Sequence, residues 1–229
     1  MNIDANFAQA GGSETGAQGR SITPSACDRQ HPQVGNGHDP AYVSSSVDAV
    51  SGPLQTGRVP RGRDGLILCL DFDGVLHHEN CLWSPKLGPY LCAPARYTLF
   101  QHAELLAQLL APYPDVAIVL STTWIRRYGV SASAKRLPEG LQKRVIGGTF
   151  HSRHMNVDEF LYLLRGQQVF HDVQRRRPRD WLALDDDGEG WPASHLDKFI
   201  QTHMYEGLGD PEITSTLAKK LEAMCKLKR

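Results

Sequence analysis

Asp71 and Asp73 are the residues in this chain that most clearly indicate chemistry. They follow an apolar run at 66–70 and precede Gly74. Two carboxylates about 4 Å apart repel each other by about 4 kcal/mol at an effective dielectric constant of about 20. A bound divalent cation, or a raised pKa on one carboxyl group, relieves that repulsion. The plain alternative is a strand that ends in an acidic turn, but the position and the flanking residues favour a functional site.

Two further polar clusters also follow apolar runs. Ser121 and Thr122 end one such run, and Asp185 and Asp186 end another. In open α/β sheets, ligands bind outside the carboxyl ends of the strands. We therefore expect the three clusters to meet in one cleft, although they are far apart in the sequence.

The chemistry that fits these residue types is attack by a carboxylate on phosphorus. Asp71 is suited to attack and to form an acyl-phosphate, which splits one difficult hydrolysis into two easier steps. Asp73 is suited to protonate the leaving alcohol and later to activate water. Ser121 can donate a hydrogen bond to a phosphate oxygen. The turn at Gly74 lets backbone N–H groups come close to the phosphate, because no side chain intervenes.

A cation is also needed, because it neutralises the phosphate oxygens and lets two anions approach each other. Hard carboxylate oxygens are the ligands that suit Mg²⁺. The sequence therefore predicts a magnesium site formed by Asp71, Asp73, Asp185 and Asp186.

Strands that alternate with helices must position these clusters. Expected strands lie at 66–70, 116–120, 144–148, 181–184 and 197–202. Expected helices lie at 95–111, from Asn156 to an interruption at Gly166, at 167–176, and from Asp210 onwards. This alternation predicts an open parallel α/β sheet with right-handed crossovers.

The stretch 77–94 is rich in Pro, Gly, Trp and Tyr and is expected to be a long irregular loop that forms a small lid beside the carboxylates. Within it, Trp83 and Tyr90 either stack on an organic substrate or pack the loop. At the start of this stretch, one interpretation of His77 is that it contacts the substrate. Outside this stretch, Trp124 is expected to belong to the core.

Charge is balanced over the chain, with 25 basic and 25 acidic residues, so no net field favours nucleic acid or an anionic membrane. A local run of arginines at 175–179 is either a nucleic-acid patch or, as we expect, the solvated end of a helix. No apolar stretch is long enough to span a bilayer, and no secretory signal opens the chain, so no membrane partner is expected.

Residues 1–60 contain only two aromatic residues, Phe7 and Tyr42, and show no sustained periodicity. They are expected to form a disordered leader, with docking on the domain or recruitment of a partner as the alternative. The chain has five cysteines, an odd number, and none form a close pair with metal-ligand spacing. This usage favours the reducing cytoplasm.

Several of these stretches resemble the motifs of a known family. Asp71-Phe-Asp-Gly-Val-Leu resembles motif I of the haloacid dehalogenase-like (HAD) hydrolase superfamily, Ser121 after Val-Ala-Ile-Val-Leu resembles motif II, and Leu-Asp185-Asp186 resembles motif IV. The resemblance covers residues 64–205. Further stretches resemble a bacterial HAD subgroup associated with RNA-repair proteins, namely 121–126, Arg165-Gly166 and 181–191.

The resemblance implies a Rossmann-like open, mainly parallel sheet with helices on both faces, in a single domain over residues 61–229. It also implies a Mg²⁺-dependent phosphatase with Asp71 as nucleophile and Asp73 as acid/base. Members that remove halogen lack an aspartate two residues after the nucleophile, so Asp73 indicates phosphoryl transfer.

The family further uses a Lys or Arg to balance the charge on nucleophile and phosphate, near the start of the helix before the motif IV strand. Arg165 is expected to fill this role, and Arg153 and Lys143 are the alternatives. The expected substrate-binding residues are Gly74, Ser121, Thr122 and Arg165.

The implied partner is a phosphorylated substrate such as a nucleotide or a polynucleotide end, because no segment is long enough for a large cap and the site should be open. The competing hypothesis is a catalytically silent fold that serves as a binding or regulatory module, with residues 1–60 as its interaction segment.

Overall fold

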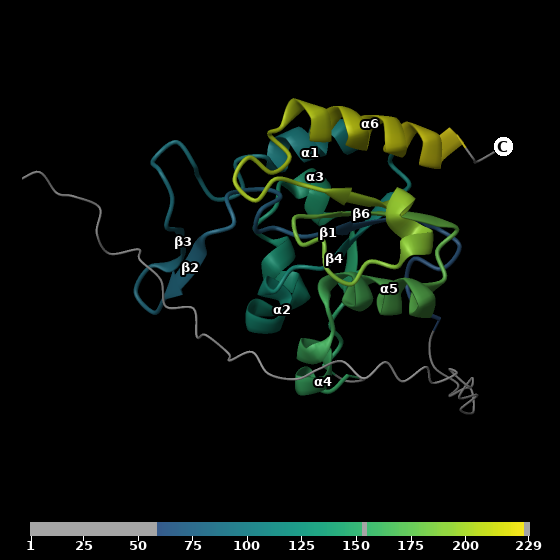
Figure 1. The fold of residues 1–229 in the computed structure, drawn as a ribbon, viewed down its shortest axis with the longest axis horizontal. Helices are drawn as coiled ribbons and strands as arrows, with labels where there is room; N and C mark the ends of the chain where they lie inside the picture. Colours follow the sequence, from purple (N-terminus) through teal and green to yellow (C-terminus); the bar gives the residue numbers. More distant parts are fainter. Residues whose placement is uncertain (1–58, 153–154, 227–229) are drawn as a thin grey trace, which may run out of the picture. The chain divides into compact units, whose positions relative to one another are not determined.

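A five-stranded parallel sheet in the order β5-β4-β1-β6-β7 forms the centre of the fold (Figure 1). The computed structural model describes residues 59–152 and 155–226, so the predicted leader lies, apart from its last two residues, outside the described part. The strands are β1 (Leu66–Leu70), β4 (Val116–Leu120), β5 (Val145–Gly148), β6 (Asp180–Asp185) and β7 (Phe199–Gln201). The prediction of an open parallel α/β sheet is confirmed.

Strand β1 occupies the middle of the sheet because every one of its five residues is apolar and buried. It pairs in parallel with β4 on one side and β6 on the other. Alternate side chains point to opposite faces of a strand. Leu66, Leu68 and Leu70 accordingly belong to one hydrophobic core, and Ile67 and Cys69 belong to the other.

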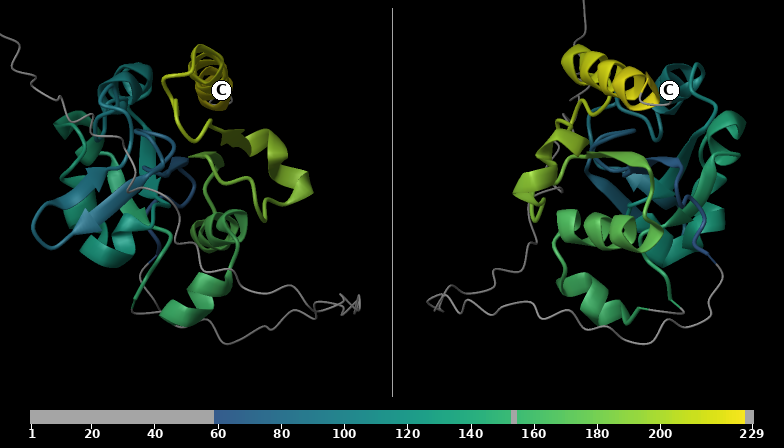
Figure 2. Two further views of the ribbon diagram at one scale, coloured as in Figure 1. Left: turned by 60° about the vertical axis from the view of Figure 1, so that its left-hand side comes forward. Right: turned by 90° about the vertical axis from the view of Figure 1, so that its right-hand side faces the viewer.

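Helices cover both faces of the sheet (Figures 1 and 2). Helices α1 (Ala103–Leu110) and α6 (Pro211–Lys226) bury their apolar stripes in the core on the Leu68 side. Helix α5 (Arg165–Arg176) packs against the opposite face through Val169 and Val173. Asp210 caps α6 as predicted, because its carboxylate accepts a hydrogen bond of 2.8 Å from the backbone N–H of Glu212.

The prediction of an irregular loop at 77–94 is wrong, because this stretch contains an antiparallel hairpin. Strand β2 (Cys81–Ser84) pairs with β3 (Gly88–Leu91). The hydroxyl of Ser84 accepts a hydrogen bond of 3.0 Å from the N–H of Leu87, and Gly88 adopts a φ of 70°. The Pro and Gly residues that indicated a loop therefore form the turn between two short strands.

Two helices were not predicted at all: α2 (Trp124–Ala134) and α3 (Glu139–Gln142). Helix α2 buries only Trp124, Ile125 and Ser133, so it has no apolar stripe to reveal it. Gly129, at a φ of 77°, breaks its helical geometry halfway along.

Three predicted helices have different bounds. The helix predicted at 95–111 is shorter, because the chain makes turns as far as His102 before α1 begins. The predicted interruption at Gly166 is also wrong. The break lies at Leu163 and Leu164, between α4 (Val157–Tyr162) and α5, and Gly166 is in the first turn of α5. A short 3-10 helix, η1 (Ala193–Lys198), precedes β7.

The arginine run at the end of α5 is not simply a solvated end. Arg176 is buried, and its Nε donates a hydrogen bond of 2.5 Å to Oδ2 of the buried Asp172. Arg175 and His151 also contact this carboxylate. No helix in the described part of the chain is both long and apolar enough to cross a membrane.

Candidate active site

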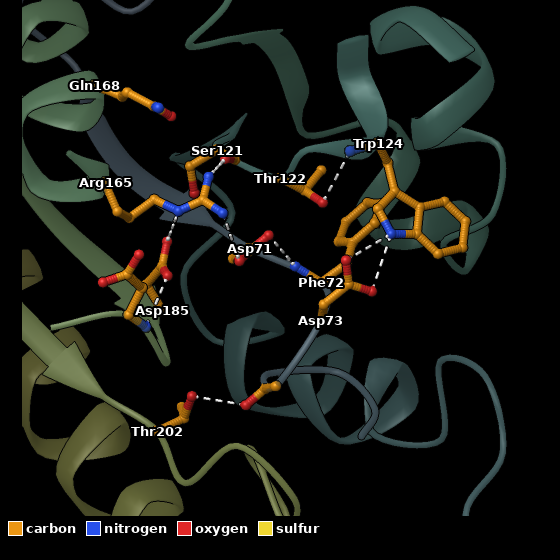
Figure 3. A network of polar contacts seen from close by, with 12 residues as sticks. Asp71, Phe72, Asp73, Ser121, Thr122, Trp124, Arg165, Gln168, Asp185 and Thr202 are labelled. Atoms are coloured by element: carbon orange, nitrogen blue, oxygen red, sulfur yellow. Dashed lines mark hydrogen bonds and ion pairs between the residues drawn. The ribbon is translucent and has the colours of Figure 1, made fainter. Parts of the chain in front are cut away.

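The three polar clusters meet at the carboxyl edge of the sheet (Figure 3). The backbone N–H of Ser121 donates to the carbonyl of Leu70 at 2.9 Å, and the N–H of Asp71 donates to the carbonyl of Leu184 at 3.1 Å. The ladder of hydrogen bonds thus continues one residue beyond the strands. Ser121, Asp71 and Asp185 consequently lie side by side, as the sequence predicts.

Arg165 lies between these residues and contacts all three (Figure 3). Its Nη2 is 3.3 Å from Oδ2 of Asp71, its Nε is 3.4 Å from Oδ2 of Asp185, and its Nη1 donates to the carbonyl of Ser121. The Arg165 side chain is only 12 % exposed. Burial by itself would lower the pKa of this guanidinium, but the neighbouring Asp71 and Asp185 carboxylates raise it, so Arg165 stays charged.

Of the two alternatives to Arg165, only Lys143 belongs to the described residues, and it is not at this place. Lys143 pairs with Glu139 at 2.6 Å on the surface, and its side chain is 73 % exposed. Arg153 lies outside the described residues. Of the two suggested cations that the structure describes, Arg165 is therefore the one whose contacts are with the aspartates.

Close backbone packing positions Arg165. The N–H of the next residue, Gly166, donates to the carbonyl of Glu189 at 2.9 Å, in the loop that follows β6. A Cβ at position 166 would lie 2.4 Å from the backbone nitrogen of Trp191, so a larger residue does not fit there. The Arg165-Gly166 pair thus joins the start of α5 to the loop that carries the acidic residues.

Asp71, Asp185 and Asp186 form a cluster in which one carboxylate oxygen of each lies within 4.8 Å of the others. Oδ2 of Asp185 is buried and accepts no hydrogen bond from the described residues. Gly74, at a φ of 67°, leaves room for the cluster, because a Cβ there would lie 2.2 Å from Oδ2 of Asp186. Three converging hard oxygens fit a divalent cation such as Mg²⁺, and Oδ2 of Asp185 has only the 3.4 Å ion pair with Arg165 among the described residues.

The same crowding affects the protonation of the cluster. Burial raises the pKa of Asp71, and burial together with the Asp71 charge raises the pKa of Asp185 well above its ordinary value. Burial and the Asp71 charge also raise the pKa of Asp186 to about 7. A bound cation would oppose these shifts, because it stabilises the charged forms of the buried carboxyl groups.

Asp73 lies apart from that cluster, although the sequence placed it among the metal ligands. Its carboxylate points toward α2, whereas Asp71 points toward Arg165 (Figure 3). The indole Nε1 of Trp124 is 3.0 Å from each carboxylate oxygen of Asp73. Nε2 of His77 lies 3.0 Å from Oδ1. The side chain of Asp73 is therefore held by two hydrogen-bonding rings, and its nearest potential ligand partners are His77 and Cys81.

The hydrogen bonds around His77 indicate which ring nitrogen of a neutral imidazole carries the proton. The backbone N–H of Phe100 points at Nδ1 at a distance of 3.4 Å, so Nδ1 acts as the acceptor. The proton of a neutral ring then resides on Nε2 and is donated to Asp73. His77 is completely buried, so it supports Asp73 and does not face the substrate directly.

Sequence reasoning missed the contacts of Trp124 and His77 with Asp73. Trp124 is buried at 5 % exposure in the main core, as predicted, but its N–H also serves the site. The spacing of four residues between Asp73 and His77 was the available signal. Nothing in the sequence indicated the Trp124 contact, because 51 residues separate the two partners.

The remaining predicted binding residues surround the same place. The Ser121 hydroxyl is buried without a hydrogen-bond partner among the described residues, which leaves it available to a ligand. The Thr122 hydroxyl accepts from the backbone N–H of Trp124 at 3.3 Å. The carbonyl of Gly74 accepts from the Thr202 hydroxyl at 2.8 Å, which fixes the turn after β1.

Two pockets open on either side of this centre. One, of about 230 Å³, is lined by Ser121, Arg165 and residues of α4, and we call it the Arg165 pocket. The other, of about 300 Å³, is lined by Asp73, the β2–β3 hairpin and the start of α2, and we call it the Asp73 pocket. A larger hollow of about 430 Å³ beside α2 has none of the acidic residues in its lining. Of the three hollows, the first is thus the one that contains Arg165 and Ser121, and the second is the one that contains Asp73.

We expect the stability of the metal-free protein to depend on pH through Asp186. Between about pH 4 and pH 7 the folded Asp186 holds a proton that the unfolded chain has lost, so its contribution to stability falls as pH rises through this window. Urea unfolding in a chelator at pH 5 and pH 7.5 measures the effect. Asp186→Asn should be more stabilised, relative to the wild type, at pH 7.5 than at pH 5.

The wild type alone does not isolate the effect of Asp186. Burial lowers the pKa values of His78 and His102, so these histidines make the folded state more stable as pH rises, opposite to Asp186. The difference between the wild type and the Asp186 variant removes their contribution. Asp187→Asn is the matched control, since Asp187 is adjacent but not in the cluster of three. An equal effect of Asp186→Asn at both pH values would contradict the prediction.

Comparison with known proteins adds one finding. A family model described as the HAD domain in Swiss Army Knife RNA repair proteins matches residues 67–213. The match contains β1 from its second residue, all of β4 and β6, and all the residues of the site described above. No curated protein and no solved structure gives a significant match.

Proposed function

The chain belongs to the family of HAD domains in Swiss Army Knife RNA repair proteins, which is part of a hydrolase-type superfamily, and we propose that it is a Mg²⁺-dependent phosphatase acting through an aspartyl-phosphate on Asp71. The observation that carries the proposal is the contact of one buried arginine with both Asp71 and Asp185, beside the unpartnered hydroxyl of Ser121. This is an arrangement in which an anion can be bound directly against a carboxylate nucleophile.

The proposed reaction has two steps. The phosphoryl group of the substrate binds between Arg165 and the Ser121 hydroxyl, and an oxygen of Asp71 attacks phosphorus. The bond from phosphorus to the leaving oxygen breaks, and that oxygen takes a proton from Asp73. Water then attacks the aspartyl-phosphate, Asp73 accepts a proton from the water, and inorganic phosphate leaves with Asp71 restored.

The charges at the site explain why Arg165 alone cannot neutralise the aspartates together with a bound phosphate. Asp71, Asp185 and Asp186 carry three negative charges when ionised, Arg165 carries one positive charge, and a phosphomonoester adds about two more negative charges. Mg²⁺ held by the three aspartates would supply the positive charge that the phosphate oxygens require. We assign Asp73 to proton transfer and not to metal binding, because its carboxylate is turned toward Trp124.

For the substrate we propose a nucleotide or a polynucleotide end. The support is the description of the matching family, which names RNA repair, together with the small size of the element that covers the site. That element is the hairpin of β2 and β3, with four residues in each strand, which leaves room for a bulky substrate. Both pockets beside the site are open to such a group.

Phosphate release from a substrate panel tests the proposal. The panel contains 3′- and 5′-phosphorylated oligoribonucleotides, mononucleotides and sugar phosphates, each with Mg²⁺ and with EDTA, and Asp71→Asn provides the background. We expect Mg²⁺-dependent release from the nucleotide substrates. If no substrate gives release above the background, the enzymatic proposal fails and a binding module is favoured. If sugar phosphates are hydrolysed well and nucleotides are not, only the substrate assignment fails.

A further inference from the structure

The Asp73 pocket contains two side chains that the proposed reaction does not require, Trp83 and Arg127. We propose that it binds the leaving group of the substrate, and that this group is a nucleotide whose base stacks on Trp83 and whose adjoining phosphodiester pairs with Arg127. The inference rests on the proposed function, because it assigns the leaving-group side of the same site.

The position of Asp73 determines on which side the leaving group lies. A general acid must come within hydrogen-bond reach of the atom that it protonates. Arg165 and Ser121 hold the phosphoryl group on the side of Asp71, whereas Asp73 lines the pocket under the hairpin. The part of the substrate that departs with its oxygen must therefore extend into the Asp73 pocket.

One wall of the pocket presents an aromatic ring that neither hydrophobic core buries. Trp83 lies on β2, remains 43 % exposed, and belongs to neither hydrophobic core of the described residues. A tryptophan that packs a loop would be buried against it. The exposure of Trp83 at the pocket thus favours the stacking alternative over the packing one. Stacking on an aromatic side chain is a general way to hold a base, because every base has a planar face.

Beside this ring, the pocket presents a cation without an anionic partner among the described residues. The guanidinium of Arg127, from the first turn of α2, lies 4.4 Å from the centre of the Trp83 ring. Among residues 59–152 and 155–226, its side chain has no hydrogen-bond or ion-pair partner, so its N–H donors remain free for an anion. Stacking on Trp83 keeps that guanidinium at the pocket.

The combination identifies the class of ligand. A planar face alone would accept many aromatic alcohols, and a cation alone would accept many anions. A strand end presents both at once, since each base is followed by a phosphodiester group. A sugar phosphate lacks the plane, and a mononucleotide lacks the second phosphate after the scissile one.

Steady-state kinetics with three substrates test the inference. The substrates are a dinucleotide with a terminal phosphate, a mononucleotide, and acetyl phosphate, whose small leaving group carries neither base nor phosphodiester. The readout is the ratio of kcat/KM for each nucleotide substrate to kcat/KM for acetyl phosphate. We expect Trp83→Ala to lower this ratio about 10-fold for both nucleotide substrates. Arg127→Ala should lower it about 10-fold for the dinucleotide and much less for the mononucleotide.

Conservative variants and a matched control sharpen the result. Trp83→Phe should retain most of the preference, because it keeps an aromatic face, and Arg127→Lys should retain part of it. Lys86→Ala is the control, since this exposed cation lies in the hairpin turn and does not line the pocket. If the ratios of the Trp83 and Arg127 variants match that of Lys86→Ala while the wild type hydrolyses acetyl phosphate, the inference is wrong and the phosphatase proposal stands. If the wild type hydrolyses none of the substrates with Mg²⁺, both are wrong.

Discussion

Asp71→Asn is expected to abolish phosphate release and, in the absence of Mg²⁺, to make the protein more stable. An amide cannot form the acyl-phosphate, so the rate should fall by about 10³-fold or more. The shape of the side chain is kept, and its oxygen can still accept the hydrogen bond of 2.8 Å from the N–H of Phe72. The loss would therefore report on chemistry and not on misfolding.

The gain in stability follows from the charges around Asp71. Its carboxylate is buried with those of Asp185 and Asp186, and Arg165 compensates only one of the three. Removal of one charge relieves part of the repulsion, and Arg165 keeps its contact with Asp185. We expect stabilisation by about 1–2 kcal/mol, which raises the unfolding temperature by roughly 2–8 °C for a chain of this size. Thermal unfolding with EDTA at pH 8 measures the change.

Asp172→Asn provides the matched control, because Asp172 is equally buried but fully paired. Arg176, Arg175 and His151 all contact its carboxylate. Burial alone would raise the pKa of Asp172, but these partners hold it below its ordinary value. The control should therefore lose about 3–5 kcal/mol. If Asp71→Asn were destabilised to a similar extent, or remained active, the account of the acidic cluster would be wrong.

Asp73→Asn is expected to have the second largest effect, and its size should depend on the leaving group. A general acid contributes about 10²–10⁴-fold when the leaving oxygen is strongly basic. We expect a loss of about 10²–10³-fold with a nucleotide and a much smaller loss with p-nitrophenyl phosphate, because nitrophenolate leaves without a proton. Comparison of kcat for the two substrates measures this difference.

Replacement of either ring that holds Asp73 should give the same dependence on the leaving group, with a smaller loss of rate. Trp124→Phe and His77→Gln remove hydrogen bonds to the carboxylate, and we expect each to reduce the nucleotide rate more than the p-nitrophenyl phosphate rate. Cys81→Ala is the control, since Cys81 lies beside Asp73 but its thiol donates to the carbonyl of Leu82. An equal loss of both rates in Asp73→Asn would exclude proton transfer to the leaving group as its role.

The sheet could be predicted from the sequence because its signals are local. Each central strand is a short apolar run, and the polar residue that ends it is the next residue in the chain. Parallel strands place such ends at one edge. Helix α2 could not be predicted in the same way, because Gly129 and the scarcity of buried side chains remove its periodicity. The hairpin escaped prediction because its turn residues are the same ones that indicate an irregular loop.

The sequence by itself determined that Asp71, Asp73, Ser121 and Asp185 lie near one another, since neighbouring residues and a regular sheet are sufficient for that. Only the tertiary structure decided which groups the carboxylates of Asp71 and Asp73 contact, and these contacts give the two residues different roles. Asp71 contacts Arg165, which is 94 residues away, and Asp73 contacts Trp124, which is 51 residues away. A carboxylate takes its orientation and its proton affinity from the groups around it. For these two residues those groups come from helices that only folding brings to the edge of the sheet.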